Sequence, residues 1–170
     1  MATAHVNIGS NSGDRLAHIE RAVTLVQSRL GSGHPLRRSS VVESDAWGYE
    51  SSNRFLNIAI AFEWDKEPRE LLRLLLCVQN EISPASHRDS EGNYIDRIID
   101  IDLIAVGDAV IDSTDLVLPH PRMQDRRFVL RPMSELEPDW IHPNLKSSVC
   151  ELLQRIENQG RQAEKKERAI

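Results

Sequence analysis

Residues 96–106, DRIIDIDLIAV, place Asp100 and Asp102 inside a run of isoleucine, leucine, alanine and valine. β-Branched apolar residues in such a run predict a strand that is at least half buried. Because side chains alternate along a strand, both carboxylates point to one face, with their Cα atoms roughly 6.5–7 Å apart. Ile101 and Leu103 then anchor the opposite face in the core. Burying a carboxylate in such surroundings costs free energy unless its charge is compensated. The two aspartates therefore indicate a role other than core packing.

Three interpretations of the two aspartates are open at this point. Both can be ligands of a divalent cation, and Mg²⁺ fits best because it prefers oxygen ligands and is commonly held by one or two carboxylates plus substrate phosphates. Alternatively, the strand lies at a sheet edge and its carboxylates are solvated. In the third interpretation they pair with nearby arginines such as Arg97. The neighbouring residues must decide between these possibilities.

Outward from this strand, hydrophobic periodicity and turn residues predict the other elements. Expected strands cover residues 4–9, 37–44, 55–64 and 96–106, and expected helices cover 16–30, 67–82, 126–136 and 147–159. Residues 83–94 are polar and predict a loop. A turn at Gly107–Asp108 predicts a short return strand near residues 110–111.

The order of these elements, β-α-β-β-α-β with additions, predicts the fold class. It fits an α+β, ferredoxin-like βαββαβ core: an antiparallel sheet with helices packed on its faces, plus an added hairpin and C-terminal helices. We expect one domain over residues 1–160 and a polar C-terminal tail over residues 161–170.

Composition excludes several classes of protein. The formal net charge of −5 argues against general nucleic-acid binding. No apolar run reaches the roughly 18 residues that a membrane span requires, and residues 1–11 do not resemble a signal peptide. Cys77 and Cys150 lie in apolar runs and predict buried, reduced thiols, which is typical of a cytoplasmic protein.

Arginines gather on both sides of the paired aspartates. Arg88 and Arg97 flank the polar loop before the strand, whereas Arg122 and Arg126 follow it, and His120 adds a further donor. The planar guanidinium matches phosphate oxygens and keeps its charge at any working pH. Arginines around paired carboxylates favour a polyphosphate–Mg²⁺ site over a merely solvated cluster. The chain contains no P-loop or dinucleotide-binding glycine motif, so a nucleotide would bind through other devices.

Phe55 and Asn57 offer a second element of a site, because they share one face of an expected strand. An amide beside an aromatic ring can read a flat heterocycle by stacking and a donor–acceptor pair. The alternative is a core phenylalanine beside a sheet-edge asparagine. Residues 45–51, DAWGYES, supply a glycine-containing loop whose backbone can meet the edge of a ligand.

Five motifs, NIGSN, AWGYE, FLNIAI, DRIIDIDLI and LPHPRMQDRRFVLRPM, occur in this order over residues 4–153. Together they resemble the 6-hydroxymethyl-7,8-dihydropterin pyrophosphokinases of folate biosynthesis. The resemblance implies a cytoplasmic, monomeric, Mg²⁺-dependent diphosphotransferase with a ferredoxin-like core. Such an enzyme moves diphosphate from ATP to the pterin hydroxymethyl group and releases AMP, without nucleic-acid or membrane partners. The rival interpretation is a non-catalytic ferredoxin-like module that binds a ligand or metal.

The resemblance also implies roles for individual residues. Two Mg²⁺ ions are expected on Asp100 and Asp102, which with Arg97 and Arg88 form the expected catalytic set. Residues expected to bind the pterin are Ser44, Trp47, Gly48, Phe55, Asn57 and Phe128. Residues expected to bind ATP are Glu81, Arg88, Arg97, Leu103, His120 and Arg126. The family carries Gly-Arg about five residues after its glutamate, where this chain has Ala85 and Ser86, and Arg88 is the nearest arginine.

Overall fold

The computed structural model describes residues 1–31, 33–84 and 95–167, with side chains described as far as residue 161. Its strands are β1 (Ala2–Ser10), β2 (Arg37–Arg38), β3 (Val42–Ser44), β4 (Phe55–Trp64), β5 (Asp100–Val106), β6 (Ile111–Asp112) and β7 (Val117–Leu118). Its helices are α1 (Arg15–Leu30), α2 (Pro68–Ile82), α3 (Arg127–Leu136) and α4 (Val149–Glu167), with a 3₁₀ turn, η1 (Met123–Asp125).

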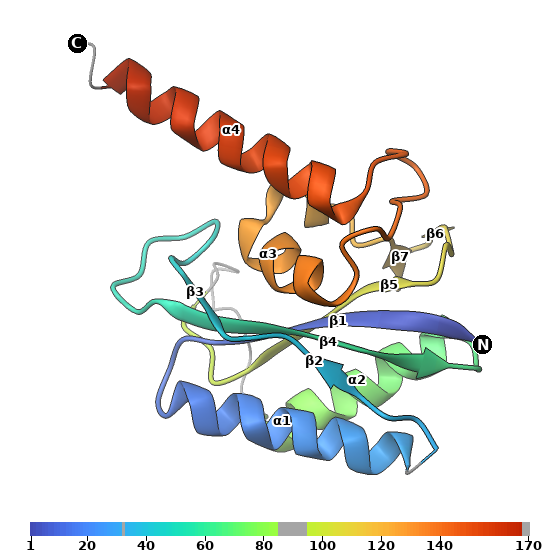
Figure 1. Ribbon diagram of the computed structural model, residues 1–170. Coiled ribbons are helices and arrows are strands. Elements are labelled where there is room, and N and C mark those ends of the chain that lie inside the picture. The colour runs from blue at the N-terminus through green and yellow to red at the C-terminus, as the bar shows by residue number, and fades with distance from the viewer. Residues whose placement is uncertain (32, 85–94, 168–170) are drawn as a thin grey trace.

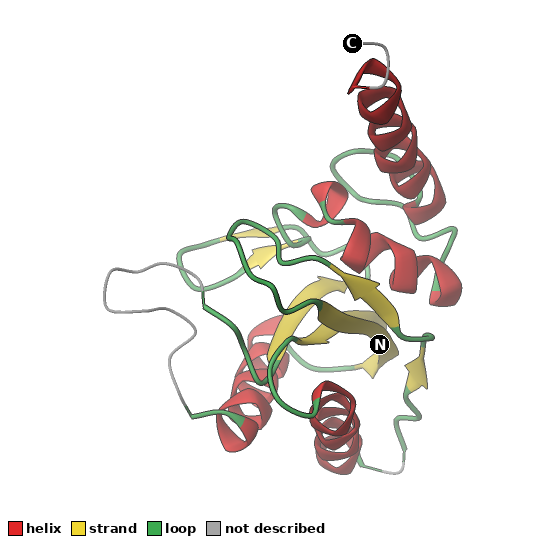
Figure 2. Ribbon diagram, turned by 90° about the vertical axis from the view of Figure 1, so that its left-hand side faces the viewer, coloured by secondary structure: helices red, strands yellow, loops and turns green. Residues whose placement is uncertain are grey.

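The main sheet has the predicted ferredoxin-like topology. Its order is β2-β4-β1-β5, with β3 also paired to β4, and the pairs between these strands are antiparallel. β1 therefore lies between β4 and β5, the strands that carry the two polar patterns predicted from sequence. The sheet separates two helical layers, α1 and α2 on one face and α3 and α4 on the other, and α4 extends away from the body (Figure 1). A view from the side shows the same layers (Figure 2).

The larger core lies between the sheet and the layer of α1 and α2. Alternate residues of each central strand enter it, including Ala4, Val6 and Ile8 of β1 and Ile101 and Leu103 of β5. Burial is the main favourable term in folding, at roughly 25 cal/mol per Å² of apolar surface, so this alternation fixes which face of each strand turns inward. It turns Asp100 and Asp102 toward the other face, as the sequence predicts.

A second core lies between the opposite face of the sheet and the layer of α3 and α4. Ala59 of β4 and Ile104 of β5 contact it from the sheet, and Val129 and Leu130 contact it from α3. The small side chain of Ala59 lets α3 approach the sheet closely. The polar ends of β1, β4 and β5 continue this same face beyond the second core, and the candidate site lies there.

Four details differ from the predicted elements. The strand predicted over residues 96–106 begins only at Asp100, as β5. Residues 37–44 form two short strands, because the register with β4 shifts by one residue between Arg38 and Val42. Ser39 spans the break: its hydroxyl accepts a hydrogen bond from the Ala59 amide at 2.9 Å. The return strand exists as β6, but its partner is β7, not β5, so the added hairpin is formed with the following segment. The last helix continues to Glu167.

The prediction that both cysteines are buried is wrong. Cys77 and Cys150 are exposed and free. On α2 the buried positions are Leu71, Leu75 and Val78, whose helical spacing turns Cys77 toward solvent. No helix in the described part of the chain is long and apolar enough to cross a bilayer.

Candidate active site

Asn57, Gly9 and Asp100 form one row across the three central strands. Gly9 pairs with Asn57 of β4 on one side and with Asp100 of β5 on the other. Since neighbouring strands lie about 4.8 Å apart, Asn57 and Asp100 are separated by roughly 10 Å, with only a glycine between them. The next row is Ala59, Asn7 and Asp102. The missing side chain at Gly9 leaves open space on the face that carries both polar patterns.

A cavity of about 190 Å³ occupies this space. Its lining comes from the ends of β1, β4 and β5, from the loop after β3, and from the segment that leads into α3. The lining residues are Asn7, Gly9, Ser44, Asp45, Trp47, Tyr49, Phe55, Asn57, Arg97, Asp100, Asp102, His120, Arg122, Arg126 and Phe128. We call it the central cavity.

On the β4 side of the central cavity, Asn57 is fixed from two directions. Its Nδ2 donates to Ser44 Oγ at 3.0 Å, and only 2% of the residue is exposed. A Cβ on Gly9 would lie 2.8 Å from Asn57 Oδ1 and 3.4 Å from a ring carbon of Phe55. The amide can therefore hold this position only because residue 9 is a glycine, whereas the ring would be in ordinary van der Waals contact with such a Cβ. Phe128 adds a second aromatic side chain to the same cavity.

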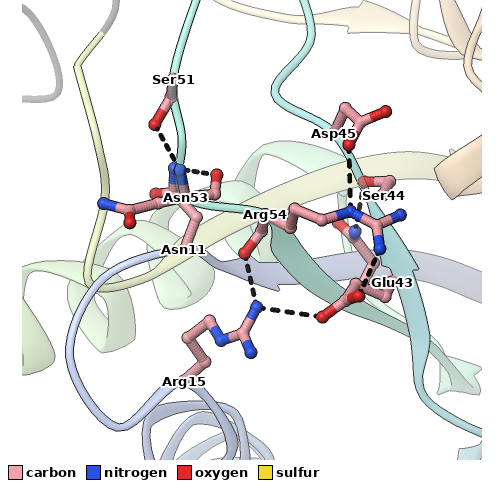
Figure 3. Close-up of polar contacts among 9 residues, drawn as sticks. Asn11, Arg15, Glu43, Ser44, Asp45, Ser51, Asn53 and Arg54 are labelled. Atoms are coloured by element: carbon pink, nitrogen blue, oxygen red, sulfur yellow. Dashed lines mark hydrogen bonds and ion pairs between the residues drawn. The ribbon is translucent and has the colours of Figure 1, made fainter.

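The end of β3 is held by ion pairs beside the cavity. Arg54 lies between Glu43 and Asp45, with Nη1–Oε1 at 2.5 Å and Nε–Oδ1 at 3.0 Å, and Arg15 contacts Glu43 at 3.3 Å (Figure 3). These groups are partly exposed, so each pair contributes little by itself, roughly 0–1 kcal/mol. As a connected set they tie the loop after β3 to the N-terminal end of α1.

Trp47 covers two arginines at the cavity. The guanidinium carbons of Arg122 and Arg126 lie 4.8 and 4.7 Å from the centre of its ring, within cation–π range. Arg126 also lies 5.6 Å from the ring centre of Phe128. A guanidinium that stacks through its flat face keeps its in-plane N–H groups available, so stacking positions these cations for an anion.

The aspartates at the start of β5 are paired with arginines. Arg97 Nη1 contacts Asp100 Oδ2, and Arg126 Nη1 lies 3.4 Å from Asp102 Oδ2. The side chains of Asp100 and Asp102 keep 22% and 28% of their surface exposed, so both remain accessible from the cavity. Burial raises the pKa of the Asp102 carboxyl, and the positive charges of Arg126, Arg97 and Arg122 oppose that rise. The pairing interpretation of the sequence is thus the arrangement found here.

His120 stands beside these cations as a neutral ring. Burial lowers its pKa to about 4, and the charges of Arg126 and Arg122 add to this effect. Its Nδ1 accepts a hydrogen bond from the backbone amide of Arg122 at 3.3 Å. A neutral imidazole can donate to phosphate without adding a further charge to the arginine cluster.

A second cavity, of about 280 Å³, opens on the α2 side of β5. It shares Asp100, Asp102 and His120 with the central cavity, so the two cavities meet at the paired carboxylates. Its remaining lining residues are Leu72, Leu76, Gln79, Ile101, Leu103, Asp115, Leu116, Val117 and Pro121. Gln79 Oε1 accepts the amide hydrogen of Ile101 at 2.8 Å and so fixes α2 against the start of β5.

Most of the residues expected from sequence converge on these two cavities. The central cavity gathers Ser44, Trp47, Phe55, Asn57, Arg97, Asp100, Asp102, His120, Arg126 and Phe128. Leu103 lines the second cavity, and Gly48 lies between the lining residues Trp47 and Tyr49. Glu81 lies in neither lining: its carboxylate pairs with Arg29 at 2.5 Å. Arg88 falls outside the described residues.

Sequence reasoning missed several lining residues. Gln79, not Glu81, is the polar residue of α2 that reaches β5. Asn7 and Gly9 share a strand face, and their i, i+2 spacing in the NIGSN motif was the available signal. Tyr49 carried no comparable signal, because its place depends on the fold of a loop.

The residues present suit a hard divalent cation. Asp100 and Asp102 supply carboxylate oxygens on one face, and beside them the buried Oδ1 of Asn7 has no hydrogen-bond partner in the described part of the chain. Among the described residues, no group of three or more histidine, cysteine or acidic side chains is gathered to enclose a metal. Two carboxylates with open positions fit Mg²⁺, which keeps several waters and takes phosphate oxygens as ligands.

Fold and site together define a class: an α+β protein with a ferredoxin-like fold, in which a cavity lined by aromatic and amide side chains meets an arginine–carboxylate centre. Comparison with known sequences gives the family. The model of the 7,8-dihydro-6-hydroxymethylpterin-pyrophosphokinase family matches residues 5–138, and this chain belongs to that family.

Relatives from three bacteria agree with this assignment, each named as a 2-amino-4-hydroxy-6-hydroxymethyldihydropteridine pyrophosphokinase. The protein of Porphyromonas gingivalis is 35% identical over 84% of this chain and 95% of its own length. That of Aquifex aeolicus is 36% identical over 84% and 85%. That of Bacillus subtilis is 35% identical over 78% and 77%.

A solved structure has the same fold. The chain resembles a crystal structure described as HPPK-DHPS in complex with substrates, with a TM-score of 0.66 and 11% identity. The match covers 91% of this chain and 43% of that one.

Proposed function

We propose that this protein transfers diphosphate from ATP to the hydroxymethyl group of 6-hydroxymethyl-7,8-dihydropterin and releases AMP, as a step of folate biosynthesis. Membership of the pyrophosphokinase family supports this function over a non-catalytic binding module. The single observation that carries it is the row Asn57–Gly9–Asp100. This row sets an amide able to read a heterocycle on one side of β1 and the candidate metal carboxylates on the other.

The pterin would occupy the central cavity. Its ring would stack between Phe55 and Phe128, and the amide of Asn57, oriented by Ser44, would read its polar edge. Because Gly9 carries no side chain, Asn57 keeps its place beside the ring, and the register of Gly9 with Asp100 would put the hydroxymethyl group on the side of the carboxylates. Because a correctly oriented pair of reactants can react as if at very high local concentration, this positioning is the main contribution expected from the protein.

ATP would enter the second cavity, with its phosphates over the carboxylates that the two cavities share. Arg97 and Arg126, now paired with Asp100 and Asp102, would turn their in-plane N–H groups to the phosphate oxygens. His120, neutral at working pH, would donate a further hydrogen bond. The pterin hydroxyl would attack the β-phosphorus in line, the bond from that phosphorus to the α,β-bridging oxygen would break, AMP would leave with this oxygen, and the hydroxyl proton would pass to solvent. These groups would stabilise charge on the transferred diphosphate.

We further propose that the reaction depends on Mg²⁺ and that Asp100 and Asp102 hold two such ions. Bound Mg²⁺ supplies positive charge that neutralises the phosphates. The two arginines then no longer have to compensate the carboxylates and can bind phosphate. A cytoplasmic monomer is the proposed form of the enzyme, consistent with free, exposed cysteines.

The decisive experiment incubates the protein with ATP, Mg²⁺ and the pterin and identifies the nucleotide product. We expect AMP in equal amount to the diphosphorylated pterin; ADP as the product would reject diphosphate transfer. Calorimetry with a non-hydrolysable ATP analogue, with and without Mg²⁺, tests the rival binding module. Binding that does not respond to Mg²⁺, together with absent turnover, would favour that module.

A further inference from the structure

Asp96, the residue before Arg97, accepts hydrogen bonds from four side chains. The donors are Ser51 Oγ at 2.7 Å, Asn53 Nδ2 at 2.5 Å, Asn11 Nδ2 at 2.8 Å and Tyr49 hydroxyl at 3.3 Å. They come from two segments far from Asp96 in sequence, the turn after β1 and the loop between β3 and β4. One carboxylate therefore joins three segments of the chain.

The interaction is strong for a partly exposed group. Burial works against ionisation of Asp96, but the hydrogen bonds from Ser51, Asn53, Asn11 and Tyr49 outweigh it and hold the pKa of this carboxyl below its ordinary value. Hydrogen bonds to an ionised acceptor are about twice as strong as neutral ones. The cluster is thus able to hold a loop that packs little apolar surface of its own.

Asn11 connects this cluster to the catalytic strand. Its side-chain Oδ1 accepts the amide hydrogen of Arg97 at 2.6 Å, and its backbone amide donates to the Arg97 carbonyl at 3.0 Å. These two bonds do not involve the Asp96 carboxylate. They fix the backbone of Arg97, whose side chain contacts Asp100. The segment before β5 therefore forms a rigid base.

The other end of the cluster is the loop that closes the central cavity. Tyr49, Ser51 and Asn53 follow Trp47 in this loop, and Trp47 covers Arg122 and Arg126. Figure 3 shows Ser51, Asn53 and Asn11 close together, beside the ion pairs of Arg54. Asp96 itself is not part of the cavity lining, whereas Trp47 and Tyr49 are.

We propose that Asp96 is a positioning residue that holds the loop of residues 45–54 against Asn11 and the backbone of Arg97. This contact keeps Trp47 over the central cavity. Asp96 touches no substrate. It acts through the four donors, and its effect falls on the pterin side of the site. This role rests on the proposed function of the central cavity as the pterin site.

The test compares Asp96→Asn with wild type in steady-state kinetics. The asparagine keeps the shape of the side chain but carries no charge. Its NH₂ group faces hydrogen-bond donors and cannot accept from them. We expect KM for the pterin to rise about tenfold or more, because the variant loses the free energy of one charge-assisted hydrogen bond. Affinity for a non-hydrolysable ATP analogue with Mg²⁺ should change less than the pterin KM, because the Asn11–Arg97 bonds remain and only the stacking of Trp47 on Arg126 is disturbed on the phosphate side.

Hydrogen exchange of residues 45–54 gives a readout independent of turnover, because a released loop exchanges faster while the strands do not. Asp96→Glu, which keeps the charge, should recover part of the pterin KM. The matched control is Glu135→Gln, a carboxylate that binds the Ser40 amide and hydroxyl at 2.8 and 2.7 Å away from the site. It should leave both KM values unchanged.

If Asp96→Asn does not fold, the double variant Ser51→Ala/Asn53→Ala removes two donors from the loop alone and should reproduce the rise in KM. The role of Asp96 would be overturned if the wild type is active and either Asp96→Asn or the double variant keeps the wild-type KM for the pterin and the wild-type hydrogen exchange of the loop. Absence of AMP formation by wild type would instead reject the proposed function. The two failures are therefore distinguishable.

Discussion

Gly9 and Asn57 are register partners across β1 and β4, and a Cβ on Gly9 would lie 2.8 Å from Asn57 Oδ1. Real Cβ atoms essentially never approach an atom so closely, so a side chain at position 9 must displace the amide. The amide of Asn57 can therefore stay fixed in the cavity only if its partner on β1, residue 9, has no side chain.

The first prediction follows from this pair. Gly9→Ala should raise KM for the pterin about tenfold to a hundredfold, because a shift of the reading group by even 1 Å is costly. Gly160→Ala is the control. A Cβ there meets nothing within 4 Å among the described residues, so its kinetics should equal wild type and its helix should gain up to about 1 kcal/mol. Unchanged pterin affinity in Gly9→Ala would show that the amide does not read the substrate.

A second prediction concerns the carboxylates of β5. Asp100→Asn and Asp102→Asn should each lower AMP formation about a hundredfold or more, because each removes a charged oxygen from the centre that faces the phosphates. Each should also weaken the Mg²⁺-dependent part of binding of a non-hydrolysable ATP analogue in calorimetry. Asp112→Asn, an exposed position on β6, is the control. Near-wild-type turnover in either variant would exclude the proposed metal role.

A third prediction separates Gln79 from Glu81. Gln79→Ala removes the acceptor for the Ile101 amide and a lining group of the second cavity, so KM for ATP should rise severalfold and stability should fall by about 1 kcal/mol. Glu81→Gln breaks only a partly exposed ion pair with Arg29 and should change KM for ATP by less than about twofold. The opposite ranking of the two variants in nucleotide kinetics would mean that ATP does not use this cavity.

A fourth prediction concerns the pH dependence of stability. His5 is 2% exposed and packs 5.7 Å from the ring centre of Trp140. Burial lowers its pKa from 6.5 to about 4, with Glu137 and Glu63 opposing and Arg37 adding to this shift. Between these two values the unfolded chain binds more protons at this position than the folded one. Stability should therefore fall as the pH drops from about 6.5 to 4, by about 3 kcal/mol from His5 alone.

The matched variant is His5→Phe, which keeps a ring against Trp140 but cannot take up a proton. Its free energy of unfolding, measured with urea from pH 7 to pH 4, should lose part of the wild-type slope. The remaining slope belongs to other groups, His120 among them, whose pKa is also lowered to about 4. A slope identical to that of wild type would show that His5 is not the buried neutral ring described here.

The alternation within residues 100–106 was enough to place Asp100 and Asp102 on one face and Ile101 and Leu103 on the other. This follows from the two-residue period of a strand, a local property that requires no knowledge of the partner strands. The order of elements likewise predicted the ferredoxin-like sheet, because short connections and pairing rules leave few alternatives. For the same reason Phe55 and Asn57 were assigned together, and both line the central cavity.

Helix α2 marks the limit of sequence reasoning. Gln79 and Glu81 are two residues apart, about 200° around a helix, so they lie on nearly opposite sides. Both are polar, and composition does not tell which one turns toward β5. Packing decided it: Leu75 and Val78 enter the core and carry Gln79 to Ile101. Similarly, the partner of β6 depended on the path of the chain after the turn, which periodicity does not encode.

The sequence by itself thus determined the elements, the faces of the strands and the chemical types of groups at the site, since these depend on local periodicity and side-chain chemistry. Tertiary structure alone decided the register of β1 against β4 and β5, which brings Gly9 between Asn57 and Asp100. It also decided that Asp96 meets donors from residues 49–53. Such contacts join residues far apart in the chain, and only the simultaneous burial of both faces of the sheet fixes them.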